Sequence, residues 1–147
     1  PNAYNPRTTE FAAYQMGYST PLFSPTGGMK ISAKDLATYM MMHANYGKYN
    51  GVRIISKKSS KLMQTAVTSI EPYGFALEAP GKIIDGKEMI GHTGFAYGLF
   101  SAMFFNPQEK FGIVVISNGC HPAETGGYNN VIKKTVTALY ETLIANQ

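Results

Sequence analysis

The spacing of apolar residues predicts a helix that starts soon after residue 32. One face of this helix has residues at positions i, i+3, i+4 and i+7: Leu36, Tyr39, Met40 and His43. Ser32 and Asp35 precede this face as a capping box, in which the serine hydroxyl takes an orphan amide and the carboxylate reaches back. Gly47 ends the pattern. Because such a face normally packs into a core, we interpret His43 as a packed helix histidine and not as a ligand.

Apolar runs in the second half of the chain predict an antiparallel meander. The runs that alternate or are continuously apolar cover residues 73–78, 82–84, 87–90, 99–105 and 111–117. Asp85-Gly86 is a tight hairpin signal between the second and third of these runs. Residues 106–110 are rich in turn formers, so we expect them to join the last two strands.

Two more helices complete the predicted order of elements. Residues 57–65 favour a short helix, and residues 131–143 favour an amphipathic one. Residues 1–31 contain four prolines and a Pro-Thr-Gly-Gly turn signal, so we expect loops there. Helices, then a meander, then a helix predict an α+β fold, an antiparallel sheet flanked by helices, in one domain without repeats or linkers.

Composition and charge exclude several classes of function. The chain has 147 residues, of which 44% are hydrophobic and 15% charged, with a net charge of +4. The basic residues are scattered, so we expect no nucleic-acid partner, which would need a denser basic stripe. No apolar run approaches the ~18 residues of a membrane span. Cys120 is the single cysteine, which excludes an intrachain disulfide. The chain begins at Pro1 instead of Met, so we expect a processed product or an excised piece.

The stretch Gly91-His92-Thr93-Gly94 is the leading candidate for chemistry. On a strand, His92 and Thr93 point to opposite faces. The two glycines weaken the strand, but they let another backbone or a ligand approach closely. Spacing alone leaves two interpretations open: a bulge in the meander, or a binding segment.

The other candidate residues give weaker indications of a functional site. Cys120 and His121 are adjacent, and the chain has only three histidines, so no spaced set of metal ligands exists and we expect no metal. A serine nucleophile needs a base. Ser-x-x-Lys, which supplies a base from the next helical turn, does not occur in the chain.

Five stretches, in order, resemble the serine β-lactamase and penicillin-binding-protein superfamily, nearest its class C-like branch of esterases and D-amino-acid peptidases. They are Ala13–Tyr18, Ser24–Met29 followed by Ser32–Ala37, Tyr73-Gly74-Phe75, Gly91-His92-Thr93-Gly94, and Asn106-Pro107 through Asn118-Gly119. The resemblance covers nearly the whole chain. It implies the C-terminal portion of the β-lactamase/transpeptidase-like fold, with no metal or organic cofactor.

The resemblance also implies a role for the glycine-flanked stretch. His92, Thr93 and Gly94 match the third active-site motif, "G-[HK]-T-G", whose strand borders the active site and orients substrate. The residue after the last glycine, here Phe95, gives its backbone N–H to the oxyanion hole. Phe95 is larger than the residue expected there and narrows the site. Histidine in place of lysine is not a permanent cation, which favours an esterase or peptidase over a dedicated β-lactamase.

The nucleophile and base are missing from this sequence. In the superfamily, Ser-x-x-Lys and Tyr-x-Asn precede the matched region. Tyr128-Asn129-Asn130 fits the second motif literally but lies after His92, so we interpret it as a chance match. We therefore expect residues 1–147 to form one partial β-lactamase-like domain, with a helical-lobe part at about 28–70 and a sheet-lobe part at about 71–147.

These observations predict the C-terminal half of a serine hydrolase that cleaves an ester, amide or peptide bond through an acyl-serine intermediate. The alternative is a non-catalytic binding or structural module with the same fold. The expected partners are a small-molecule or peptide substrate, and either the remaining N-terminal part of the protein or a second copy. The partner is expected because strands 99–105 and 113–116 are apolar on both faces, and the last helix covers only one. Family resemblance implies a periplasmic or extracellular location.

Overall fold

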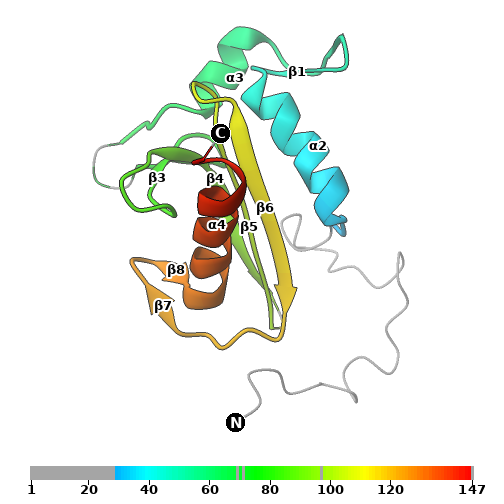
Figure 1. The fold of residues 1–147 in the computed structure, drawn as a ribbon. Coiled ribbons are helices and arrows are strands. Elements are labelled where there is room, and N and C mark those ends of the chain that lie inside the picture. Colours follow the sequence, from blue (N-terminus) through cyan, green and yellow to red (C-terminus); the bar gives the residue numbers. More distant parts are fainter. Residues whose placement is uncertain (1–28, 69, 71, 97, 147) are drawn as a thin grey trace.

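The centre of the molecule is an antiparallel four-stranded sheet in the order β3-β4-β5-β6 (Figure 1). The computed structural model describes residues 29–68, 70, 72–96 and 98–146. The strands of the sheet are β3 Glu78–Gly81, β4 Met89–Ala96, β5 Leu99–Asn106 and β6 Phe111–Asn118. Strands that are adjacent in the sheet are also consecutive in the sequence, so the sheet is a meander. The predicted α+β fold, an antiparallel sheet flanked by helices, is confirmed.

Helices cover both faces of the sheet. Helix α4, Asn130–Leu143, packs on a cluster that contains Phe104, Ile132 and Val136. Helix α2, Ala33–Ala44, packs on a second cluster that contains Met40 and Phe105. Consecutive residues of β5 thus fill opposite cores, because side chains alternate across a strand.

This arrangement corrects one expectation from the sequence. The second cover for the apolar strands comes from α2 in the same chain, and not from a partner (Figure 1). On its outer edge, β6 pairs with no described strand. The partner stays a prediction, and its structural basis is this open edge.

Helix α2 begins as predicted, with one difference at its cap. The Ser32 hydroxyl oxygen accepts a hydrogen bond from the Asp35 amide at 3.1 Å. The Asp35 carboxylate accepts a hydrogen bond from the Ser32 hydroxyl at 2.7 Å instead of reaching the Ser32 backbone. On the inner face, Met42 is buried whereas Tyr39 is exposed. His43 is 1% exposed, which confirms it as a core residue.

A hairpin and a short helix follow α2. The hairpin joins β1, Lys48–Tyr49, to β2, Val52–Arg53. Helix α3, Lys57–Met63, lies within the predicted range 57–65 and ends two residues earlier. Its N-cap is Ser56, whose hydroxyl oxygen accepts from the Ser59 amide at 3.0 Å.

The predicted strand at residues 73–78 is wrong. The segment is a turn, in which the Gly74 amide donates to the Leu77 carbonyl at 2.7 Å and Ala76 has a φ of 60°. It wraps the end of α3 so closely that a Cβ on Gly74 would lie 2.1 Å from the Met63 carbonyl oxygen. The alternating apolar residues of this segment therefore belong to a packed turn and do not form a β-strand.

The hairpin predicted around Asp85-Gly86 is only partly correct. The turn exists, with a φ of 76° at Gly86. The flanking residues form no ladder, because β3 pairs with β4 through Glu78 and Gly81. Ile83 and Ile84 are both buried in the core under α4, which successive residues of a regular strand cannot achieve.

The later elements match the prediction. The β5–β6 turn is held by Asn106, whose side-chain oxygen accepts from the amides of Gln108 and Glu109. A small hairpin of β7, Glu124–Thr125, and β8, Tyr128–Asn129, leads into α4. Within the described part of the chain, no helix has the length and apolar character needed to cross a membrane. The loops predicted for residues 1–28 and the stretches matched at 13–18 and 24–28 lie outside the described residues. The division at about residue 70 stays a prediction.

Candidate functional site

The residues singled out from the sequence lie in the second half of β4. Strand β4 pairs with β5 from Ile90, opposite Phe105, to Ala96, opposite Leu99. On its other side, β3 pairs with β4 only as far as Gly91. The half from His92 to Ala96 therefore pairs with no described strand on that side, which leaves an open strand edge there.

The glycines that flank His92 and Thr93 have different structural reasons. A Cβ on Gly91 would lie 2.0 Å from the carbonyl oxygen of Met103 and 2.7 Å from Cα of Phe104. Gly91 is thus required by the close approach of the β5 backbone. A Cβ on Gly94 would meet only the Ser101 hydroxyl oxygen, at 2.5 Å. The expectation of close backbone approach is confirmed at Gly91.

His92 is an exposed side chain packed against one aromatic ring. The Tyr73 ring lies edge-on to the imidazole, with centroids 5.5 Å apart. Nδ1 of His92 donates to the Thr93 carbonyl oxygen, which fixes the neutral ring as the Nδ1–H tautomer. Nε2 has no hydrogen-bond partner among the described residues, so it can accept a hydrogen bond from a ligand.

Tyr73 was not expected at the site, because the sequence placed it on a separate strand. Burial, and then the nearby Glu78 carboxylate, raise the pKa of the Tyr73 phenol. The phenol therefore stays neutral at neutral pH, and it can donate a hydrogen bond but not act as a base there. The Tyr-Gly-Phe stretch that resembles a superfamily motif was the available signal.

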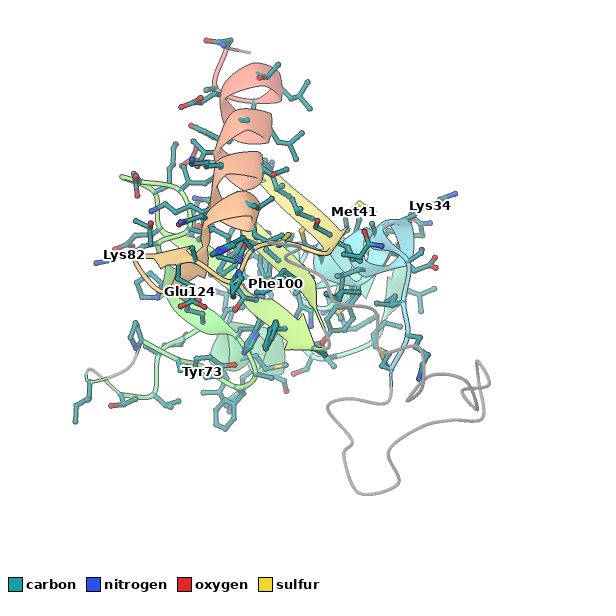
Figure 2. The ribbon with its side chains drawn as sticks, turned by 90° about the horizontal axis from the view of Figure 1, so that it is seen from below. Lys34, Met41, Tyr73, Lys82, Phe100 and Glu124 are labelled. Atoms are coloured by element: carbon teal, nitrogen blue, oxygen red, sulfur yellow. The ribbon has the colours of Figure 1, made fainter. Side chains whose placement is uncertain are left out.

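Thr93 and Phe95 lie on the other face of β4, toward α4. They line a small cavity of about 50 Å³ together with Phe100, Glu124 and Asn129. Figure 2 shows the positions of two of these residues, Phe100 and Glu124. Phe95 is 70% exposed, and its ring lies 4.7 Å from that of Phe100. The exposed aromatic ring forms a wall beside the open edge of β4.

Glu124 and Asn129 are further residues that the sequence did not single out. The Asn129 side-chain oxygen caps α4 by accepting from the Val131 amide at 3.0 Å and from Ile132 at 3.3 Å, and its amide donates to the His121 carbonyl at 2.7 Å. Both the oxygen and the amide nitrogen of this side chain therefore hold the backbone around the start of α4. Glu124 is exposed and lines the same cavity as Thr93. It lies 31 positions after Thr93 in the chain, and no sequence spacing connects the two.

Tyr128 has a structural role in the described fold. Its hydroxyl donates to the Glu78 carboxylate and accepts from the Lys82 amide, the latter at 2.8 Å. Burial, followed by the hydrogen bond to Glu78, raises the pKa of Tyr128 far above its ordinary value. A phenol held neutral in this way cannot serve as a base, in agreement with its interpretation as a chance match to Tyr-x-Asn.

The described residues contain no cluster of three or more His, Cys, Asp or Glu side chains that could hold a metal ion. Cys120 is buried, and His121 accepts a hydrogen bond at Nδ1 from the Ala123 amide. The structure brings His92 together with Tyr73, and Thr93, Gly94 and Phe95 together with Glu124. Among the described residues, the structure identifies no side chain as a nucleophile.

Comparison with known proteins gives one finding about the whole chain. No curated protein and no solved structure matches it. A family model described as Beta-lactamase matches residues 2–137, which include every stretch that carried the resemblance. The match covers far more than half of the sequence, and the chain belongs to the β-lactamase family.

Proposed function

We propose that this chain forms the substrate-binding side of a serine hydrolase that cleaves an ester, amide or peptide bond through an acyl-serine intermediate. The observation that carries the proposal is the open second half of β4, which holds His92, Thr93, Gly94 and the exposed Phe95 in a chain of the β-lactamase family. An open strand edge offers backbone hydrogen bonds to an extended substrate.

Each residue of this segment has a separate role in the proposal. The Phe95 amide donates to the oxyanion that develops on the attacked carbonyl, where a fixed donor stabilises charge that the ground state lacks. His92 accepts a substrate hydrogen bond at Nε2, because its Nδ1 is already engaged with Thr93. The Thr93 hydroxyl orients the substrate from the opposite face of the strand.

The nucleophile and base come, in this proposal, from sequence outside the 147 residues. Ser-x-x-Lys does not occur in the chain, and Tyr128 is engaged with Glu78. The residues of β4 then supply binding and charge stabilisation, and the step that makes and breaks the acyl-serine bond takes place on a serine brought against them. A periplasmic or extracellular location is part of the same proposal, by resemblance.

A second candidate function is a binding or structural module without catalysis. The observation in its favour is the absence of an activated serine from the sequence. Such a module keeps the open edge of β4 for a ligand and performs no chemistry on it.

Labelling by a serine-directed fluorophosphonate distinguishes the two. The protein is expressed with all sequence that its gene encodes before Pro1, and, in parallel, as residues 1–147 alone. We expect the first to be labelled covalently and to turn over nitrophenyl acetate, and the second to do neither. An unlabelled, inactive gene product supports the module. Saturable turnover by residues 1–147 that disappears on one Ser→Ala change contradicts the location of the nucleophile.

A further inference from the structure

The basic residues are scattered along the chain, but the acidic residues are not, so the net positive charge is concentrated in one segment. No acidic residue occurs between Asp35 and Glu71, whereas five of the thirteen basic residues do. These five are Lys48, Arg53, Lys57, Lys58 and Lys61. The rest of the chain has eight basic and nine acidic residues, so the net charge of +4 comes from this segment.

The fold gathers these cations at one end of the molecule. They lie on the β1–β2 hairpin and on α3, at the end opposite to β7 and β8 (Figure 1). Tyr46 is the centre of the group: Nζ of Lys57 and Nζ of Lys61 lie 5.9 Å and 5.7 Å from its ring centroid. Arg53 donates to the Tyr46 carbonyl oxygen at 2.9 Å. All five side chains are exposed.

Neighbouring carboxylates do not neutralise this charge in the described structure. The carboxylates of ion pairs there are Glu109, which holds Lys87, and Asp85, which holds Lys133. Both pairs lie on other elements. None of the five cations has a described carboxylate within ion-pair distance, so their field extends into solvent.

Exposed aliphatic side chains share the same elements. Val52 is 61% exposed, Ile54 65% and Leu62 55%. Val52 belongs to β2, Ile54 follows it directly, and Leu62 is on α3. We call these three residues and the five cations the basic-aliphatic surface.

We propose that the basic-aliphatic surface docks the protein on an anionic lipid bilayer. Cations are attracted to anionic headgroups, and exposed aliphatic side chains gain by leaving water at the boundary of headgroups and acyl chains. A soluble polyanion accounts for the cations but gives the three aliphatic side chains nothing to contact. The surface belongs to α3 and the hairpin, so the inference does not rest on the proposed hydrolase activity.

Vesicle binding by the 147-residue chain tests this directly. Vesicles of phosphatidylcholine with about one third phosphatidylserine are compared with pure phosphatidylcholine by sedimentation at low salt. Each basic residue near an anionic surface is worth about fivefold in partitioning. We therefore expect Lys57→Gln/Lys58→Gln/Lys61→Gln to weaken binding to the anionic vesicles by roughly 100-fold. Added salt weakens the binding of the unmodified chain, because it screens exposed charges.

The matched control removes three exposed cations elsewhere, as Lys82→Gln/Lys110→Gln/Lys134→Gln, and has the same net charge as the first variant. We expect it to bind as the unmodified chain does. Equal loss in both triple variants overturns the proposal, because net charge alone then explains binding. Absence of binding to anionic vesicles at low salt also overturns it.

A second variant separates a bilayer from a soluble polyanion. Val52→Ser/Ile54→Ser keeps every charge and is expected to weaken vesicle binding at least tenfold, whereas Val131→Ser on α4 leaves it unchanged. Heparin binding is measured in parallel. Heparin binding that matches vesicle binding, with no effect of the serine variants on either, shows a polyanion site and overturns the bilayer proposal. Melting curves verify that all variants are folded.

Discussion

The two halves of β4 share one strand and one partner, yet they differ in almost every other respect. Gly91 lies between β3 and β5, Met89 pairs with Gly81 of β3, and both are buried. From His92 onward, β3 is absent, and His92 and Phe95 are exposed. The packed half is closed by neighbouring backbone, whereas the open half presents side chains and a strand edge.

The difference shows that one short glycine-flanked stretch contains two kinds of constraint. Gly91 is required by the fold, because the β5 backbone occupies the space that a Cβ would fill. Gly94 lies in the open half, where only the end of the Ser101 side chain is close. A glycine that is closely packed against a backbone and one that is close only to a side chain look identical in the sequence.

Replacing each glycine by alanine tests this contrast directly. Neither glycine has a positive φ, so alanine fits both backbones and the difference is steric. We expect Gly91→Ala to lower the free energy of unfolding by about 3 kcal/mol, as overpacking against a backbone does. Gly94→Ala is expected to change it by less than about 1 kcal/mol, because the Ser101 hydroxyl can rotate away.

Urea unfolding of both variants gives the comparison. Gly94→Ala/Ser101→Ala removes the one close contact at Gly94 and serves as the control, with stability equal to that of Ser101→Ala. Similar losses at Gly91 and Gly94 would contradict the division of β4 into a packed half and an open half.

The pH dependence of stability distinguishes the packed half of β4 from the open half, because a different histidine lies at each half. His43 packs between Tyr39 and Phe105, and Phe105 lies opposite Ile90 in the packed half of β4. Neither ring nitrogen of His43 has a hydrogen-bond partner among the described residues, and burial lowers the pKa of His43 from 6.5. At high pH the ring is neutral in both states. As pH falls through 6.5, the unfolded chain takes up the proton first, so folding loses stability.

The slope of this loss is at most about 1.4 kcal/mol per pH unit below pH 6.5. We expect His43→Leu to flatten the dependence of unfolding free energy on pH in this range and to cost little at pH 8. His92→Gln, in the open half, keeps the acid sensitivity of the unmodified chain. Acid sensitivity that persists in His43→Leu and disappears in His92→Gln would reverse the assignment.

Local sequence signals predicted much of the fold. Ser32 with Asp35 and Asn106 at the β5–β6 turn act on amides within three residues, and such signals are visible in a single sequence. Ser56 caps α3 in the same local way, although it was not singled out from the sequence. The apolar runs of β5 and β6 also sufficed, since burial on both faces leaves few polar positions. The strand expected at 73–78 failed because its form depends on contact between Gly74 and Met63, which composition does not reveal.

The same distinction applies to the candidate site. His92 and Thr93 were visible because glycines flank them in sequence, whereas Tyr73 and Glu124 join them only through the fold. Tyr73 precedes His92 by 19 positions, and a turn with a positive φ at Ala76 lies between them. Periodicity carries no information on such contacts, so the sequence indicated only part of the candidate site.

Truncation of the His92 side chain tests whether the open half of β4 contributes to catalysis. In the hydrolytically active gene product proposed above, we expect His92→Ala to lower kcat/KM about fivefold to tenfold, the value of one substrate hydrogen bond. Its melting midpoint should remain nearly unchanged, because the ring is exposed. His92→Lys is the conservative variant, since the resembling motif accepts either residue, and it should retain more activity than alanine.

Turnover of nitrophenyl acetate and thermal melting are measured on the same preparations. A collapsed melting midpoint with unchanged activity per folded molecule would make His92 a packing residue, and the open half of β4 would then differ little from the packed half.

The smallest expected effect concerns Phe95, the exposed ring at the end of the open half. Aromatic pairs contribute about 0.5–1.5 kcal/mol beyond area burial, and exposure of Phe95 reduces its share of the contact with Phe100. Phe95→Ala is therefore expected to lower the free energy of unfolding by about 0.5 kcal/mol, measured by urea unfolding of the 147-residue chain. Its packed counterpart is Phe104, fully buried against Tyr128 at a centroid distance of 5.9 Å, where Phe104→Ala should cost about 4 kcal/mol. Comparable losses at the two positions would show that Phe95 is held in a core in solution, and the wall beside the open edge of β4 would be closed to substrate.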